Sequence, residues 1–237
     1  MSEQLSISER VKRAVETGKW IIRADNDGVS PFYDAKGFKW SLLGEWTEAQ
    51  DFNEKRKCGG GLHGQDRNYS GSIMGSRLVF CETEGEHIAI GDKVKVRRAA
   101  ILLINQLPEG LTVGGGLDLR GTQIAALPEG LTVWGGLYLR GTKIAALPKG
   151  LTVGGGLDLS WTKIAALPEG LTVGGDLDLS GTQIAALPEG FTVGGDLDLS
   201  WTQIAALPKG LTVGGDLDLS GTPLERSQRA KKKARAS

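Results

Sequence analysis

The residues best suited to chemistry are two cysteines and two histidines, which are the only ones in the chain. They are Cys58, His63, Cys81 and His87. The pattern C-x4-H followed by C-x5-H offers two sulfur and two nitrogen ligands, a donor set that suits a zinc ion. It lacks the C-x2-C pair usual in zinc sites, and a buried cysteine with structural histidines explains the same residues. The sequence favours this second interpretation and leaves zinc as the one cofactor to test for.

Catalysis has little support from these residues. Cys58 and His63 could act as a nucleophile and its base, but no third group is marked out to orient the histidine. The three glycines at 59–61 are followed by no Lys-Ser or Lys-Thr pair and preceded by no clear strand, which argues against a phosphate-binding loop. We therefore expect a protein that is not an enzyme.

A second set of candidate residues recurs every twenty positions around an L-x-L triplet. The middle residue of the triplet is Asp118, Tyr138, Asp158, Asp178, Asp198 or Asp218. The residue before the triplet is aspartate in three copies, namely Asp176, Asp196 and Asp216. The residue after the triplet is Arg120, Arg140 or serine, and the next position, otherwise glycine, holds Trp161 and Trp201. Carboxylates beside exposed aromatic residues are typical of recognition surfaces. We expect these residues to bind a partner with a basic surface.

These residues recur because one twenty-residue unit is repeated six times, each copy starting with LP[EK]G. The copies begin at Leu107, Leu127, Leu147, Leu167, Leu187 and Leu207. A fixed period of this length is typical of a solenoid, in which each unit buries its apolar side against its neighbours. Alternate strand residues point to opposite faces, so both leucines of the triplet should enter the core while the middle residue faces out. Each proline should keep its segment extended and outside the hydrogen-bonded ladder.

The pattern L-x-L-x-x-T-x-I-x-x-L-P over residues 107–224 resembles the short bacterial type of leucine-rich repeat. The resemblance implies a parallel β-solenoid over residues 101–225 with little or no helix, and a general β-helix is the alternative. Two departures stand out. The family has asparagine where this chain has threonine, as at Thr182, and it has a first leucine where this chain has glycine, as at Gly174.

Residues 1–100 predict a small α+β domain that caps the solenoid. A capping-box pattern at Ser6–Glu9 and a stop at Gly18 predict a first helix. Short strands are expected at 19–23, 77–81, 87–90 and 93–97. The segment KCGGGLHG, with GFKW upstream, resembles an uncharacterised small domain of phage and prophage proteins, which implies a phage-related origin. At the far end, where Pro223 breaks the pattern, we expect a second cap.

Charge is balanced overall but not locally. Residues 1–100 contain 16 basic and 15 acidic residues, so this part is nearly neutral. Residues 101–225 contain 6 basic and 13 acidic residues, and residues 226–237 contain 6 basic and no acidic residues. The last segment predicts a disordered tail, which could contact nucleic acid weakly, screen the acidic array or remain solvated. No signal peptide or membrane segment is visible, so we expect a soluble, cytoplasmic protein that contacts no membrane.

Three functions fit the acidic array. The first is a non-enzymatic protein-binding module, for which the phage resemblance implies an inhibitor of a bacterial defence factor. In this interpretation Trp161 and Trp201, about 10 Å apart, form a clamp for a flat group or an arginine. The second is a DNA mimic that occupies a nucleic-acid site. The third is a spacer or rod, in which the aspartates only keep a long sheet soluble. Stacked carboxylates repel one another, so the sequence alone gives them no stabilising role.

Overall fold

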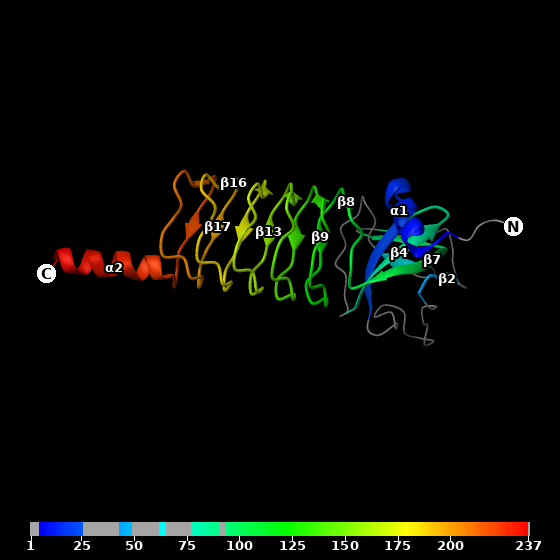
Figure 1. Cartoon of the computed structure of the whole chain (residues 1–237), viewed down its shortest axis with the longest axis horizontal. Coiled ribbons are helices and arrows are strands. Elements are labelled where there is room, and N and C mark those ends of the chain that lie inside the picture. The colour runs from blue at the N-terminus through cyan, green and yellow to red at the C-terminus, as the bar shows by residue number, and fades with distance from the viewer. Residues whose placement is uncertain (1–4, 26–42, 49–61, 65–76, 91–92, 237) are drawn as a thin grey trace.

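The structure is a computed structural model that describes residues 5–25, 43–48, 62–64, 77–90 and 93–236. A small region of one helix and two sheets is followed by a parallel β-solenoid and a second helix (Figure 1). No helix in these ranges is long and apolar enough to cross a membrane.

The first helix, α1 (Ile7–Thr17), confirms the prediction and its cause. The Glu9 backbone N–H donates to the Ser6 hydroxyl at 3.3 Å, and the Ser6 N–H donates to the Glu9 carboxylate at 2.8 Å. Each bond satisfies an N–H group that has no partner inside a helix. Gly18 ends the helix in the left-handed region at a φ of 67°.

Two antiparallel sheets follow. The first has the order β1 (Trp20–Asp25), β4 (Arg77–Glu84), β7 (Arg98–Ile104) and β2 (Trp46–Glu48); the second has the order β3 (Leu62–Gly64), β6 (Lys93–Val96) and β5 (Ile88–Ile90). The strands expected near residues 19–23, 77–81, 87–90 and 93–97 are therefore confirmed, and β4 runs three residues further than predicted. Strand β7 leads directly into the first repeat.

The first sheet has two apolar faces with different partners. On one face Trp20, Phe80 and Leu102 belong to the same buried cluster as Ala14 of α1 and the leucines of the solenoid. On the other face a separate buried cluster includes Ile21 of β1 and two valines of β6. The first cluster runs without a break into the repeats, so the sheet closes the N-terminal end of the solenoid.

The solenoid contains two parallel six-stranded sheets, which confirms the predicted parallel β-solenoid. One is built from Thr-Val strands: β8 (Thr112–Val113), β10 (Thr132–Val133), β12 (Thr152–Val153), β14 (Thr172–Val173), β16 (Thr192–Val193) and β18 (Thr212–Val213). The other is built from the L-x-L triplets: β9 (Leu117–Asp118), β11 (Leu137–Tyr138), β13 (Leu157–Asp158), β15 (Leu177–Asp178), β17 (Leu197–Asp198) and β19 (Leu217–Asp218). We number the repeats as coils 1 to 6, starting at Leu107, Leu127, Leu147, Leu167, Leu187 and Leu207.

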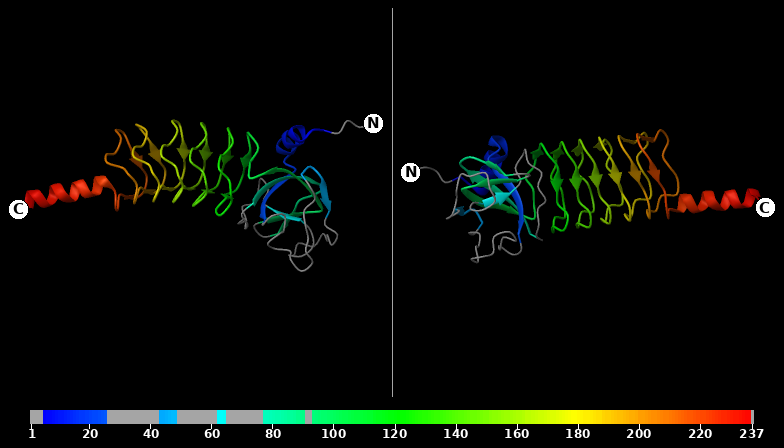
Figure 2. Two further views of the ribbon diagram at one scale, coloured as in Figure 1. Left: turned by 60° about the horizontal axis from the view of Figure 1, so that its bottom comes forward. Right: turned by 180° about the vertical axis from the view of Figure 1, so that it is seen from behind.

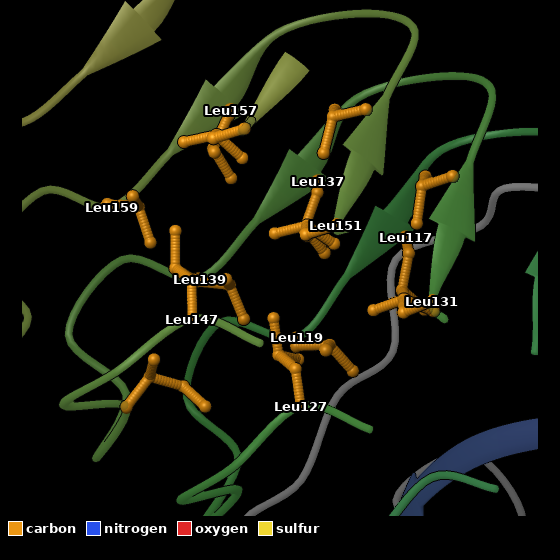
Figure 3. Close-up of a cluster of buried hydrophobic side chains, with 14 of the residues drawn as sticks. Leu117, Leu119, Leu127, Leu131, Leu137, Leu139, Leu147, Leu151, Leu157 and Leu159 are labelled. Atoms are coloured by element: carbon orange, nitrogen blue, oxygen red, sulfur yellow. The ribbon is translucent and has the colours of Figure 1, made fainter. Parts of the chain in front are cut away.

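The interior of the solenoid consists mainly of leucines, with valines and isoleucines, and the leucines stack on their counterparts in the next coil (Figure 3). Leu117, Leu137 and Leu157 form one such row, and both leucines of each triplet are buried in coils 1 to 5, as predicted. The prolines lie outside both ladders, which also confirms the prediction. The threonine that departs from the family pattern is buried and donates its hydroxyl within its own coil, as from Thr182 to the Leu179 carbonyl at 2.6 Å.

The corner between the two strands of a coil explains the second departure. A β-carbon on Gly174 would lie 2.2 Å from the carbonyl oxygen of Gly154, one coil earlier. Backbone therefore touches backbone at this corner, and a side chain fits only if the neighbouring backbone shifts. Two residues after each corner glycine there is room for a side chain. A β-carbon on Gly156 would lie 3.4 Å from the nearest backbone atom, and coils 4 to 6 have aspartate at the equivalent position.

The C-terminal segment corrects the sequence-based prediction. Residues 226–237 were expected to be disordered, but α2 (Pro223–Ala236) is a helix that projects beyond the last coil along the long axis of the molecule (Figures 1 and 2). The Glu225 N–H donates to the Thr222 hydroxyl at 3.1 Å. Thr222 is thus the N-cap and Pro223 the first helical residue, a favoured start that the charge of the tail had obscured.

The crowded corner gives a first testable prediction. Gly174→Ala should lower the free energy of unfolding by about 1–3 kcal/mol, because the methyl group must push neighbouring backbone away. Gly156→Ala should change it by less than about 0.5 kcal/mol, since its surroundings are open. Urea denaturation of both variants measures the difference. Equal effects would show that the corner is not sterically closed.

Candidate binding face

The candidate site is the outer surface of the sheet β9–β19, which we call the strand face. It comprises the middle residue of each triplet, the residues on either side of the triplet, and the next position, which holds Trp161 and Trp201. The middle residues are half-buried or exposed in every coil, while the leucines beside them point inward. The alternation expected from the sequence therefore places all the predicted partner-binding residues on or beside one surface. Whether they bind a partner stays a prediction.

The middle aspartates hold the ends of their own strands. A carboxylate oxygen of Asp158 accepts the Ser160 backbone N–H at 2.9 Å, and Asp178 and Asp198 accept the same N–H of their coils at 2.8 and 2.7 Å. Such a bond satisfies a backbone donor where the strand turns away from the sheet. Coil 2 does without it, because Tyr138 stands in this position.

The aspartates before the triplet bond between coils. Asp176 accepts the backbone N–H of Asp196 at 2.9 Å, and Asp196 accepts that of Asp216 at 2.7 Å. Each carboxylate thus fixes the next coil, and the two stacked sets of aspartates are partly structural. This corrects the argument that stacked carboxylates give the fold nothing in return for their repulsion.

Hydrogen bonding also affects protonation at the last coil. The Ser220 hydroxyl and the Ser220 backbone N–H hold the pKa of Asp218 below its ordinary value of 3.8. Because the pKa is lower in the folded protein than in the unfolded chain, the stabilisation is present above the unfolded pKa. It is lost as the pH falls through the lowered, folded pKa.

The charge of the strand face changes along the solenoid. In coil 1 the Arg120 guanidinium donates to both oxygens of Asp118, at 2.9 and 2.7 Å, and lies 5.5 Å from the centre of the Tyr138 ring. Asp118 in turn raises the pKa of Arg120 through hydrogen bonding and charge. Arg120 and Asp118 therefore neutralise each other. The acidic part of the strand face lies in coils 4 to 6. Each of these coils has two aspartates, and serine takes the place of arginine after the triplet.

Trp161 and Trp201 occupy backbone conformations that suit glycine. Their φ angles are 57° and 60°, and the glycines at the same position in the other coils have φ angles between 67° and 75°. A bulky residue in this left-handed region is a conformational outlier, with a strain of about 1–2 kcal/mol. Both indoles are nevertheless largely exposed, at 61% and 66%.

The two indoles lean in the same direction and do not face each other as a clamp. A β-carbon on Gly181 would lie 3.0 Å from the Trp161 ring, and one on Gly221 would lie 3.0 Å from the Trp201 ring. Each ring therefore covers the glycine of the following coil. This explains why tryptophan and glycine alternate from coil 3 to coil 6, and it replaces the expected 10 Å slot with two separate exposed rings.

Sequence reasoning missed a third exposed tryptophan, Trp134, which is 62% exposed. It stands in the crowded corner, where Gly114, Gly154 and Gly174 occupy the corresponding positions in other coils. The sequence does show that Trp134 is exceptional, because the other five repeats have glycine at this position. Its meaning depends on the crowding, which the sequence does not show.

The proposed zinc ligands are only partly described. Cys58 lies outside the described residues, and the structure gives His63 only as part of the backbone of β3. Cys81 is buried beside Ile21, its neighbour across β1 and β4, and the His87 ring nitrogen Nε2 lies 2.7 Å from the Thr83 hydroxyl. Among the described residues there is no group of three or more side chains that could hold a metal ion. Zinc binding stays a prediction.

Comparisons of this chain with protein-family models, with curated proteins and with solved structures found no match.

The aspartate bonds give a second prediction. Asp178→Asn should leave the free energy of unfolding unchanged or slightly raised, because the amide oxygen can still accept the Ser180 N–H while one like charge disappears. Asp178→Ala should lower it by about 1 kcal/mol, since the donor loses its partner. Urea denaturation at neutral pH compares the two variants. The structural role is wrong if alanine and asparagine behave alike.

The backbone strain gives a third prediction. Trp161→Gly and Trp201→Gly should each keep or raise the melting temperature, because glycine adopts the left-handed region freely. Trp20→Ala is the control: this buried indole should cost about 3–5 kcal/mol when removed. Thermal denaturation followed by circular dichroism measures all three. A loss at Trp161 or Trp201 as large as at Trp20 would show that these rings are part of the core.

Proposed function

We propose that this protein is a non-enzymatic binding module that holds a basic surface of another protein on the strand face, with Trp134 of coil 2 as a further exposed contact beside it. One observation carries the proposal. All three tryptophans of the solenoid are exposed, and all three stand where the other coils have glycine. Two of these positions favour glycine by their φ angle, and the third by backbone crowding. Backbone strain at a side chain that stays mostly exposed is typical of functional positions.

The chemistry of the face suits lysine and arginine side chains. Trp161 follows Asp158 by three residues in coil 3, and Trp201 follows Asp198 by three in coil 5, so each indole comes directly after an acidic strand. A partner's arginine could stack on an indole and direct its guanidinium to the neighbouring aspartates. Exposed aromatic residues next to charged groups commonly dominate the binding energy of an interface. The aspartates would add electrostatic attraction during encounter.

The biological setting rests on resemblance. The L-x-L-x-x-T-x-I-x-x-L-P pattern supports a scaffold of the short bacterial leucine-rich repeat type, and CGGGLHG supports a phage-related origin. Together they favour an inhibitor of a bacterial defence factor that works by occupying a basic surface in the cytoplasm. This setting requires no cofactor and no catalytic residue.

DNA mimicry is the second candidate, and the charge spacing favours it. The two aspartates in each of coils 4 to 6 place one negative charge every ~2.4 Å along the axis, if coils are ~4.8 Å apart. Duplex DNA carries one charge every ~1.7 Å. Mimicry leaves the strained tryptophans unexplained, however, as does a role as a spacer. Direct nucleic-acid binding by the chain itself is proposed only as a weak contact of the basic segment in α2.

The test is capture of a partner from a bacterial host with matched baits, followed by kinetics with the purified partner. Trp161→Gly with Trp201→Gly should weaken binding about thirtyfold or more while the fold is retained. Asp178, Asp198 and Asp218→Asn should slow association at low salt and flatten its salt dependence, with the strand-end hydrogen bonds preserved.

The control removes the same charge elsewhere. Glu129, Glu169 and Glu189 are exposed in the turns after the prolines, and changing all three to Gln should leave association within about twofold of the unmodified protein at moderate salt, where distant surface charges are screened. Equal slowing by the glutamate and aspartate variants would exclude the strand face as the binding surface. Competition by duplex DNA for the captured partner would instead favour mimicry.

A further inference from the structure

The C-terminal end of the solenoid is open, which is contrary to the expectation of a second cap. Leu207 and Leu217 are 37% and 36% exposed, whereas their counterparts in coils 1 to 5 are buried. Leu211, Val213 and Leu219 are only half-buried. The apolar interior of coil 6 therefore faces solvent.

The last coil also has backbone N–H groups for which no following coil supplies a carbonyl partner. Leu197 and Leu199 donate their N–H groups to the carbonyls of Asp216 and Asp218 in the next coil, at 2.8 and 2.9 Å. Leu217 and Leu219 hold the same positions in coil 6, where no coil follows. In the described part of the chain, β18 and β19 each pair with one neighbour and form the edges of their sheets. Open edges of this kind readily pair with another chain.

Helix α2 covers only one corner of the opening. Its first turn supplies the Glu225 carboxylate to the Gly221 N–H at 3.0 Å and packs Leu224 against the core. From Arg226 to Ala230 every residue is exposed. A helix of 14 residues with so little packing is marginal by itself in water.

Only one end of the solenoid is available for pairing. The sheet β1-β4-β7 closes the N-terminal end, so a head-to-tail stack of copies has no second surface to meet. The surface that matches an open coil 6 is another open coil 6. Such a contact is isologous and closes at two copies.

A two-fold axis also gives α2 a place to bind. If β19 of one copy pairs with β19 of another across a two-fold, the two strands run antiparallel. The corner where α2 leaves one copy, after Ser220, then meets the corner where the strands of the other copy begin. That corner carries Asp176, Asp196 and Asp216.

Length and charge both match this site. At ~1.5 Å per residue α2 is ~21 Å long, and coils 4 to 6 at ~4.8 Å each span ~14 Å. The segment after Glu225 holds six basic and no acidic residues. Because α2 continues the long axis beyond coil 6 (Figures 1 and 2), it would run beside the second copy without a change of direction.

We propose that two copies of this chain join through their open coil 6 ends, with α2 of each copy lying along the Asp176, Asp196 and Asp216 side of the other. The dimer interface buries the exposed leucines and pairs the edge strands, and it places the basic helix α2 against an acidic surface. In the dimer α2 occupies the Asp176, Asp196 and Asp216 side of the strand face. The middle aspartates stay available to a partner, as do Trp161 and Trp201, which lie after the strands on the opposite side.

Sedimentation of the full chain over a concentration series tests the proposal. The unmodified protein should form dimers, and Leu217→Glu should weaken them at least about tenfold by placing a charge in the joint. Leu5→Glu is the matched control, since Leu5 is 39% exposed at the other end of the molecule, and it should leave the dimer unchanged. A protein that stays monomeric, that forms chains longer than dimers, or that responds equally to both changes would overturn the proposal.

Deletion of residues 226–237 separates the role of α2 without altering the solenoid. The shortened chain should dimerise at least about tenfold more weakly and lose most of its salt dependence. An unchanged dimer with unchanged salt dependence would exclude the helix from the joint. Trp161→Gly with Trp201→Gly should keep the dimer intact, so this inference can fail or succeed independently of partner binding by the strand face.

Discussion

The stacking of each coil on the next, in register and at the spacing of a β-sheet, is the constraint on which this structure depends. It places every residue against its counterpart twenty positions away, so Leu137 lies between Leu117 and Leu157. It also brings backbone against backbone at the glycine corner, where a β-carbon on Gly174 fits only if the neighbouring backbone shifts. The core therefore follows from repetition, and any side chain that breaks the repetition must be accommodated by all its neighbours.

This constraint gives meaning to the exceptions on the outer surface. Trp134, Trp161 and Trp201 add large exposed side chains at positions where the coil geometry favours glycine. The aspartates differ, because they serve the stack as well as the surface. Asp176 holds the next coil through a backbone hydrogen bond, and Asp178 holds the end of its own strand. Substitutions of the aspartates must therefore remove the charge and keep the hydrogen-bond acceptor, as asparagine does, whereas the tryptophans can be replaced by glycine.

The same stacking makes the two ends of the solenoid unequal. At the N-terminal end the sheet that carries Trp20, Phe80 and Leu102 continues the apolar core and closes it. At the other end coil 6 has the residues of an interior coil but lacks a following neighbour, so Leu207 and Leu217 are exposed. Helix α2 caps one corner through Glu225 and then leaves the surface. In our proposal a second copy of the chain covers the open coil 6, and its acidic side binds the basic helix α2, which otherwise packs against little.

The sequence by itself determined the twenty-residue coil, the inward leucines, the outward aspartates and the first helix. These features depend on alternation, period and the Ser6–Glu9 capping box, which are properties of residues close together in the chain. Thr222 and Pro223 also indicate a helix start in the sequence, because threonine is a favoured N-cap and proline a favoured first residue. The basic charge of the following residues led instead to the prediction of disorder. Only the tertiary structure decided the second sheet, because two-residue strands such as β14 are too short for an alternating pattern. It alone decided the strain at Trp161, the bond from Asp196 to Asp176 and the open end at Leu217, because these arise where coils touch or where a coil lacks a neighbour.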